Sequence, residues 1–282
     1  MSSSPVDVVA AEVSPDAPPD GSTTSEVVVG VDGSRVALEA VRWAAAEAAA
    51  RSAPLRIVHA ATYLGEPASP DGAPPELPRA RSILATAYTT ARHAAAGLEV
   101  STQLVTDPPA AALLHAGDAA SLLVLGISTT GVADELVLAS LTQRVCAQAS
   151  RPVVVVPRAG ATSVSSRPIV AVLGPDDPAD DAAVVSFAAD AARRTRRALT
   201  LLDLREGGSS DDGWRETVGD LQVERTPLPH AAAVTILEAV CPTPLLVLST
   251  GHAARFHRLD RLHRWLLRHC TSPMALVPSS AG

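Results

Sequence analysis

Two short segments carry residues that could bind a phosphorylated ligand. Asp32-Gly33-Ser34 follows an apolar run at residues 27–31, and Gly126 ends a second apolar run at residues 122–125. A carboxylate accepts hydrogen bonds from sugar hydroxyls, and the backbone N–H groups of a loop or a helix N-terminus hold phosphates without any lysine. Asp32-Gly33-Ser34 alone is also typical of a turn followed by a helix cap, so that alternative stays open.

The basic residues exclude several kinds of catalysis. All 23 of them are arginine, because the sequence contains no lysine. Schiff-base chemistry, a pyridoxal-phosphate lysine and a Walker-type phosphate lysine are therefore excluded. The sequence also has no Gly-x-Ser-x-Gly motif, so nothing in it supports a catalytic triad. These exclusions favour a protein that is not an enzyme, and the alternative of an enzyme stays open.

Charge, apolar runs and cysteines limit the partners and the compartment. A net charge of −7 argues against a nucleic-acid partner, and no apolar run approaches the ~18 residues of a membrane span. Residues 1–26 carry no basic side chain, so they do not resemble a signal peptide. Cys146, Cys241 and Cys270 lack metal-ligand spacing and are interpreted as buried apolar residues in a reducing compartment. These features predict a cytoplasmic protein without a metal.

Arginine and histidine gather near the C-terminus. His252, His257, His263 and His269 are five or six residues apart, a spacing that does not place metal ligands on one helix face. Arginines at steps of three and four predict a basic helical stripe, which either holds an acidic or phosphate-bearing partner or is a solvated face. These arginines are Arg255, Arg258, Arg261, Arg264 and Arg268.

Apolar runs alternate with helical stretches along the first half of the chain. This alternation is typical of a doubly wound α/β fold with a parallel sheet. The predicted strands cover residues 27–31, 55–60, 98–105, 122–126 and 153–156, and the predicted helices cover residues 35–51, 79–96, 110–116 and 139–150.

The pattern then repeats. Residues 169–174 resemble residues 28–33, residues 245–249 resemble residues 122–126, and both copies end in an apolar strand bounded by proline. The second copy is shorter by roughly twenty residues in its middle. We therefore predict two tandem domains, each with its own five-stranded parallel sheet, whose last strands pair with each other because an exposed sheet edge is normally covered. The predicted divisions are a disordered tail at residues 1–25, a first domain at 26–158, a linker at 159–167 and a shortened second domain at 168–282.

Four segments carry a resemblance to a known family. They read VVVGVDGSRVALEAVRWAAAEAA (residues 27–49), LRIVHA (55–60), LLVLGISTTGVADELVLASLT (122–142) and SRPVVVVP (150–157). In these segments the chain resembles the universal stress protein family, in its tandem two-domain form. The resemblance implies sheets with strand order 3-2-1-4-5 and, as in some members, a site for ATP.

The resemblance assigns roles to individual residues. Asp32 would be the carboxylate on the nucleotide side, Gly30 would keep the strand end open, and Ala60 would offer its backbone to the base. Ser140 and Thr142 would lie at the phosphate end. In an open parallel sheet, a ligand binds where the strand order reverses, which here is between the first and fourth strands.

The glycine motif of ATP-binding members is degenerate in this chain. They carry Gly-x-x-Gly, then nine residues, then Gly-Ser or Gly-Thr. This sequence has Gly126, then Thr129 in place of the second glycine, then Ala139-Ser140 after the same interval. If those glycines adopt positive φ, an alanine costs roughly 1–2 kcal/mol and a threonine fits worse. In the second copy Leu173 stands where Asp32 stands in the first, so we expect no nucleotide site there.

Three functions follow as hypotheses. The leading one is a noncatalytic stress-response or signalling module with a weak or lost ATP site in the first domain. The second is a nucleotide sensor or slow ATPase that uses Asp32, Gly126, Ser140 and Thr142. The third is an adaptor that binds an acidic or phosphate-bearing partner through the arginine-rich segment. A protein partner or a homo-oligomer fits the first and third.

Overall fold

The computed structural model describes residues 26–62, 77–127, 133–158, 166–174, 178–205, 213–228, 233–251 and 259–278. The predicted tail at 1–25, Thr129, and residues 159–165 of the predicted linker lie outside the described residues. No helix in the described ranges is long and apolar enough to span a membrane.

The first half is a doubly wound unit. Its strands β1, β2, β3, β4 and β5 are parallel and lie in the order β3-β2-β1-β4-β5, so the predicted order is confirmed. The continuous apolar runs become strands that are buried on both faces, as in Val27 and Val28 of β1. The elements are β1 (Val27–Gly30), α1 (Arg35–Arg51), β2 (Leu55–Ala60), α2 (Leu77–Ala94), β3 (Val100–Val105), α3 (Pro109–Asp118), β4 (Leu122–Ile127), α4 (Ala133–Gln148) and β5 (Val153–Pro157).

The second half repeats this strand order, with a strand in place of one helix. Strand β8 pairs antiparallel with β9 at the sheet edge, at the point in the chain where the first half has helix α2. The prediction of a purely parallel five-stranded copy is therefore wrong. A tight turn at Gly219, with φ of +64°, joins β8 to β9, so that strand β8 stands where the first half has a helix. The elements are β6 (Ile169–Leu173), α5 (Pro178–Thr195), β7 (Leu199–Asp203), β8 (Trp214–Val218), β9 (Leu221–Pro227), α6 (Ala233–Val240), β10 (Leu246–Ser249), α7 (Arg261–His269) and β11 (Met274–Val277).

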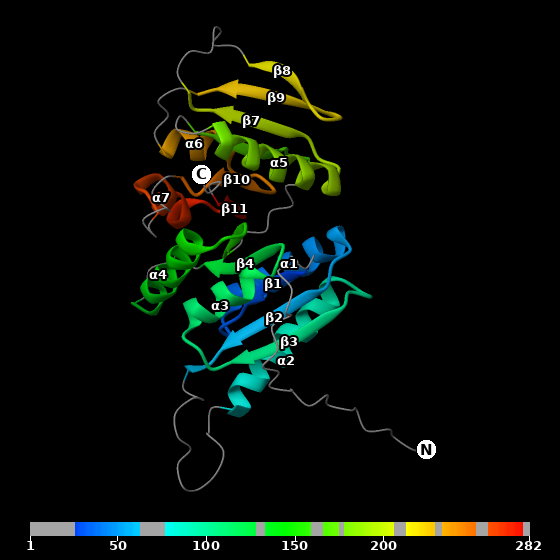
Figure 1. Cartoon of the computed structure of the whole chain (residues 1–282), viewed down its shortest axis with the longest axis vertical. Helices are drawn as coiled ribbons and strands as arrows, with labels where there is room; N and C mark the ends of the chain where they lie inside the picture. The colour runs from blue at the N-terminus through cyan, green and yellow to red at the C-terminus, as the bar shows by residue number, and fades with distance from the viewer. Residues whose placement is uncertain are drawn as a thin grey trace, which may run out of the picture.

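The two halves share one sheet. Strand β11 pairs antiparallel with β5, with Ala275 opposite Val154, and the result is an 11-stranded mixed sheet. The predicted pairing of the last strands is confirmed, but the prediction of two separate sheets is wrong, because this pairing joins them into one. An antiparallel pair at the junction relates the halves by an approximate twofold rotation, and Figure 1 shows the first half below the second along the length of the molecule.

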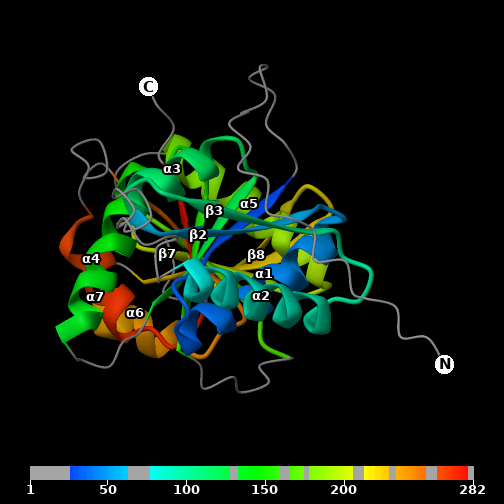
Figure 2. The same ribbon diagram turned by 90° about the horizontal axis from the view of Figure 1, so that it is seen from below.

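Helices cover both faces of the sheet. Buried residues of α1, α2 and α5 form the core on one face, and those of α3, α4, α6 and α7 form it on the other. Figure 2 shows α1 and α2 on one side of the strands and α3 and α4 on the other. Alanines let α1 approach the sheet closely, which explains a core almost without aromatic rings. The buried alanines of α1 are Ala37, Ala40, Ala44, Ala45 and Ala48.

Candidate functional site

The predicted nucleotide site lies where the strand order reverses. Strand β1 lies between β2 and β4, and the three strands end at the same edge of the sheet because they are parallel. This topology brings together Gly30, Asp32, Ala60 and Gly126, which the sequence had pointed to in three separate segments.

Asp32 is held in a short turn in front of helix α1. Its Oδ1 accepts a hydrogen bond from the Ser34 N–H at 2.8 Å, and the Ser34 hydroxyl accepts one from the Ala37 N–H at 3.2 Å. Gly33 has φ of +86°, a conformation that favours glycine. The turn and the helix cap that the sequence left open are therefore both present, and the carboxylate of Asp32 remains exposed to solvent.

Packing leaves little space beside the two site glycines. A Cβ at Gly126 would lie 2.7 Å from the carbonyl oxygen of Val36, in the first turn of α1. A Cβ at Gly30 would lie 2.6 Å from the Leu113 side chain. Because the protein itself fills both spaces, neither glycine is by itself a sign of ligand binding.

His59 supports the loop that carries Asp32, a role that was not predicted from the sequence. The side chain is 5% exposed, and its Nδ1 donates to the Val31 carbonyl oxygen at 2.8 Å. The Val31 N–H in turn donates to the Val58 carbonyl oxygen at 2.9 Å. A histidine ring within the buried strand β2, directly before Ala60, was the signal that could have identified it.

The predicted phosphate end differs from expectation. Helix α4 begins at Ala133, whereas the predicted helix began near Ala139. Ala139, Ser140 and Thr142 therefore lie inside the helix, where each backbone N–H donates to the carbonyl oxygen four residues earlier. Thr142 is buried, at 3% exposure. Positive φ occurs only at Ser52 and Arg196 among the described residues other than glycine, so Ala139 carries no such strain.

The equivalent place in the second half is filled. Leu173 is buried at the end of β6, at 2% exposure. The ring of His263, on α7, lies between the Asp260 carboxylate and the Ser249 carbonyl oxygen, at 2.7 Å from Nδ1 and 2.6 Å from Nε2. Protein atoms thus occupy the space above the end of β10.

An ion-pair network lies at the end of β7. The Asp203 carboxylate accepts hydrogen bonds from Arg205 and from Arg225, each at 2.9–3.0 Å. Burial alone would raise the pKa of Asp203, but these arginines lower it to about 2. Arg225 also pairs with Glu216 at 3.0 Å, and Arg205 with Asp181 at 3.3 Å. Each carboxylate of this network in the described ranges is paired with an arginine, although Asp181 Oδ2 has no hydrogen bond.

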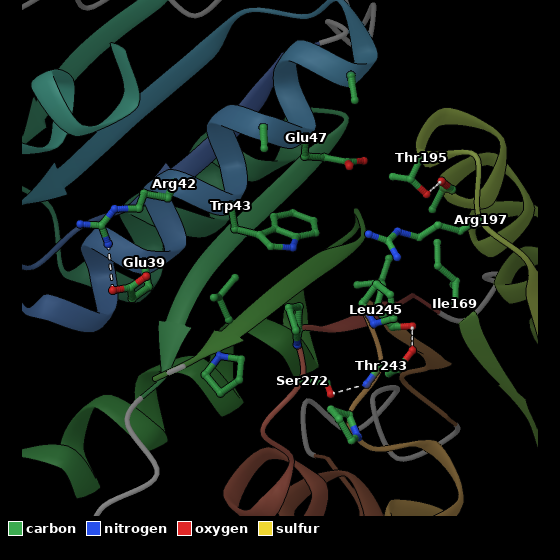
Figure 3. A pocket seen from close by; sticks show the side chains of 18 of the residues that line it. Glu39, Arg42, Trp43, Glu47, Ile169, Thr195, Arg197, Thr243, Leu245 and Ser272 are labelled. Atoms are coloured by element: carbon green, nitrogen blue, oxygen red, sulfur yellow. Dashed lines mark hydrogen bonds and ion pairs between the residues drawn. The ribbon is translucent and has the colours of Figure 1, made fainter. Parts of the chain in front are cut away.

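A cavity of about 510 Å³ lies between the two halves. Figure 3 shows Trp43 and Glu47 of α1 facing it from one half and Arg197, Thr243 and Ser272 from the other. Its walls are mainly apolar, and Thr243 and Ser272 are hydrogen-bonded to each other at 2.9 Å. None of the predicted site residues that the structure describes lines this cavity. In the described ranges, no group of three or more histidine, cysteine, aspartate or glutamate residues could hold a metal ion.

Comparisons with known proteins agree with this geometry. The model of the universal stress protein family matches residues 24–157. A universal stress protein of Mycolicibacterium smegmatis is 26% identical over 293 residues, covering 89% of this chain and 96% of the relative. One of Thermus aquaticus is 36% identical over 137 residues, covering 46% of this chain and 96% of the relative.

Other relatives match over less of their length or only in fold. A universal stress protein of Mycobacterium tuberculosis is 33% identical over 105 residues, which is 36% of this chain and 36% of the relative's own length. The crystal structure of a universal stress protein from Archaeoglobus fulgidus has a TM-score of 0.69 at 13% identity, covering 92% of this chain and 98% of that one. That likeness concerns the fold of the whole chain.

Proposed function

Because this chain belongs to the universal stress protein family, in its tandem form, we propose that it is a noncatalytic stress-response module. Its first half has a weak or lost ATP site, and its second half has none. The two halves share a strand order but differ at the ends of their strands. Asp32 is exposed in the first half, while Leu173 and His263 fill the corresponding space in the second.

The start of helix α4 is the observation that carries this proposal. A helix N-terminus binds phosphate through its first N–H groups, which have no partner inside the helix. Here those groups belong to the turn that begins at Ala133. The N–H groups of Ala139 and Ser140 lie further along and are used within the helix. ATP would have to unwind nearly two turns of α4 to reach them, which costs binding energy.

A nucleotide sensor or slow ATPase is the second candidate, and Asp32 favours it. The carboxylate is exposed at the reversal of strand order, and His59 and Ser34 hold its loop in place. An adaptor is the third candidate. Arg261, Arg264 and Arg268 of α7 are exposed, so this part of the predicted basic stripe is available to an acidic partner. Residues 252–258 of that stripe lie outside the described residues.

Nucleotide carried through purification tests the proposal against the second candidate. The full chain is purified without added nucleotide and denatured, and the released nucleotides are identified and counted by mass spectrometry. We expect far less than one nucleotide per chain, and the same small amount from Asp32→Ala. Close to one ATP per wild-type chain, lost in Asp32→Ala, would contradict the proposal and establish the nucleotide sensor.

A further inference from the structure

Two cysteines lie next to each other, beside residues that line the cavity between the halves. Cys241 directly follows helix α6, and Cys270 caps the C-terminus of helix α7. Their Sγ atoms are 3.4 Å apart and within hydrogen-bond reach of each other. All three cysteines were predicted to be buried apolar residues, and a separation of 29 positions gives no sign in the sequence that two of them are in contact.

The two thiols have different surroundings. Cys241 is partly exposed, whereas Cys270 is 2% exposed. The Ser272 hydroxyl donates to the Cys241 sulfur at 3.7 Å, and the Cys270 thiol and the N–H groups of Thr271 and Ser272 also face that sulfur. These donors stabilise a thiolate, and they lower the pKa of Cys241 to about 6 although burial opposes them. The neighbouring sulfur and burial raise the pKa of Cys270.

The third cysteine provides a contrast inside the same chain. Cys146 lies in the last turn of α4 at 1% exposure, and burial raises the pKa of its thiol. A buried neutral thiol reacts slowly, because the thiolate is the nucleophile. Only Cys241 therefore combines partial exposure, a favoured thiolate and a second thiol within hydrogen-bond distance.

We propose that Cys241 and Cys270 form an oxidation-sensitive dithiol that closes to a disulfide when a hydroperoxide reaches Cys241. The Cys241 thiolate attacks the peroxide, the O–O bond breaks, and Cys241 becomes a sulfenic acid while hydroxide or alkoxide leaves. The Cys270 sulfur then attacks the sulfenic sulfur, the S–O bond breaks, and water leaves with the Cys270 proton. The two thiols lose two electrons and the peroxide gains them. This proposal is independent of nucleotide binding.

The position of the pair connects its oxidation to the cavity. Pro242 and Thr243 follow one cysteine, Thr271 and Ser272 follow the other, and all four line the cavity. The Ser272 hydroxyl links the two loops. It accepts a hydrogen bond from the Thr243 N–H at 2.9 Å and donates one to the Cys241 sulfur. A disulfide needs the sulfurs at about 2.0 Å, so its formation draws the two loops together and changes this wall.

Peroxide treatment of the reduced full chain tests the proposal. After treatment, free thiols are blocked with iodoacetamide and the chain is digested with trypsin, which cuts after arginine. We expect one disulfide-linked pair of peptides, residues 226–255 with residues 269–282, which dithiothreitol separates. The peptide that contains Cys146 should be alkylated only when the chain is unfolded first. In untreated protein, the alkylation rate of Cys241 should rise with a midpoint near pH 6.

Single substitutions assign the two roles. Cys270→Ser should stop the reaction at a sulfenic acid on Cys241, which dimedone traps, and Cys241→Ser should prevent oxidation of Cys270. Cys146→Ser is the matched control and should leave the linked peptides unchanged. The wild-type digest decides the question even if a variant does not fold. Absence of the linked pair at peroxide levels that oxidise free cysteine, or a first sulfenic acid on Cys270, would overturn the proposal.

Discussion

Asp203 and Asp32 show how differently the two halves use a carboxylate near a strand end. Asp32 is exposed and bonds only locally, to the Ser34 N–H, among the contacts seen in the described residues. Asp203 is 8% exposed and accepts from Arg205 and Arg225. The Asp32 carboxylate is available to a ligand, whereas the Asp203 carboxylate is bound to arginines of the fold. The sequence could not separate these roles, because Arg225 comes from the unexpected hairpin.

The network around Asp203 makes stability depend on pH in acid. Its folded-state pKa of about 2 is below the ordinary value of 3.8, so its contribution to the free energy of unfolding is complete above the ordinary value and is lost as the pH falls towards 2. The contribution is about 1–2 kcal/mol after solvent screening. Denaturant titrations at several pH values should show this loss in the wild type and not in Asp203→Asn. An equal loss in both proteins would contradict the assignment.

Helices α1 and α5 are joined by a buried charge cluster. Glu47 Oε1 accepts from Arg51 Nε at 2.7 Å and from Arg194 Nη2 at 2.8 Å, and the Glu47 side chain is 9% exposed. The pairing of Glu47 with Arg51 could be predicted from their spacing of four residues on one helix. The contact with Arg194 could not, because it joins the two halves across 147 positions. The Arg51 guanidinium also lies over the Phe187 ring, 5.8 Å from its centroid.

Removal of Glu47 should destabilise the protein strongly. Glu47→Ala leaves two partly buried guanidinium groups facing each other without their carboxylate, which costs about 3–5 kcal/mol. Glu39→Ala on the same helix is the control, because Glu39 is 38% exposed and pairs with Arg42 on the surface, a pair worth under about 1 kcal/mol. Urea unfolding of both variants measures the difference. Similar losses in the two variants would show that the cluster does not hold the helices together.

At the scale of the whole molecule, the sequence predicted the repeat, the strand order and the pairing of β5 with β11. These depend on apolar runs whose length and order are visible in the chain. The start of α4 was predicted six residues too late. The helix propensity of residues 133–138 extends it toward β4. Strand β8 was missed, because its residues WRETV are mostly exposed and resemble a loop. The cavity combines helix α1 and the end of β5 from the first half with helix α5 and loops from the second, so no local pattern predicts it.

Calorimetric titration of the full chain with ATP tests the central claim most directly, because it counts sites and measures affinity at once. We predict no more than one site per chain, with a Kd weaker than about 0.1 mM. Any residual heat of binding should vanish in Asp32→Ala and persist in Trp265→Phe, a substitution on α7 of the second half. Two equivalent sites per chain, or one site with a micromolar Kd, would contradict the account.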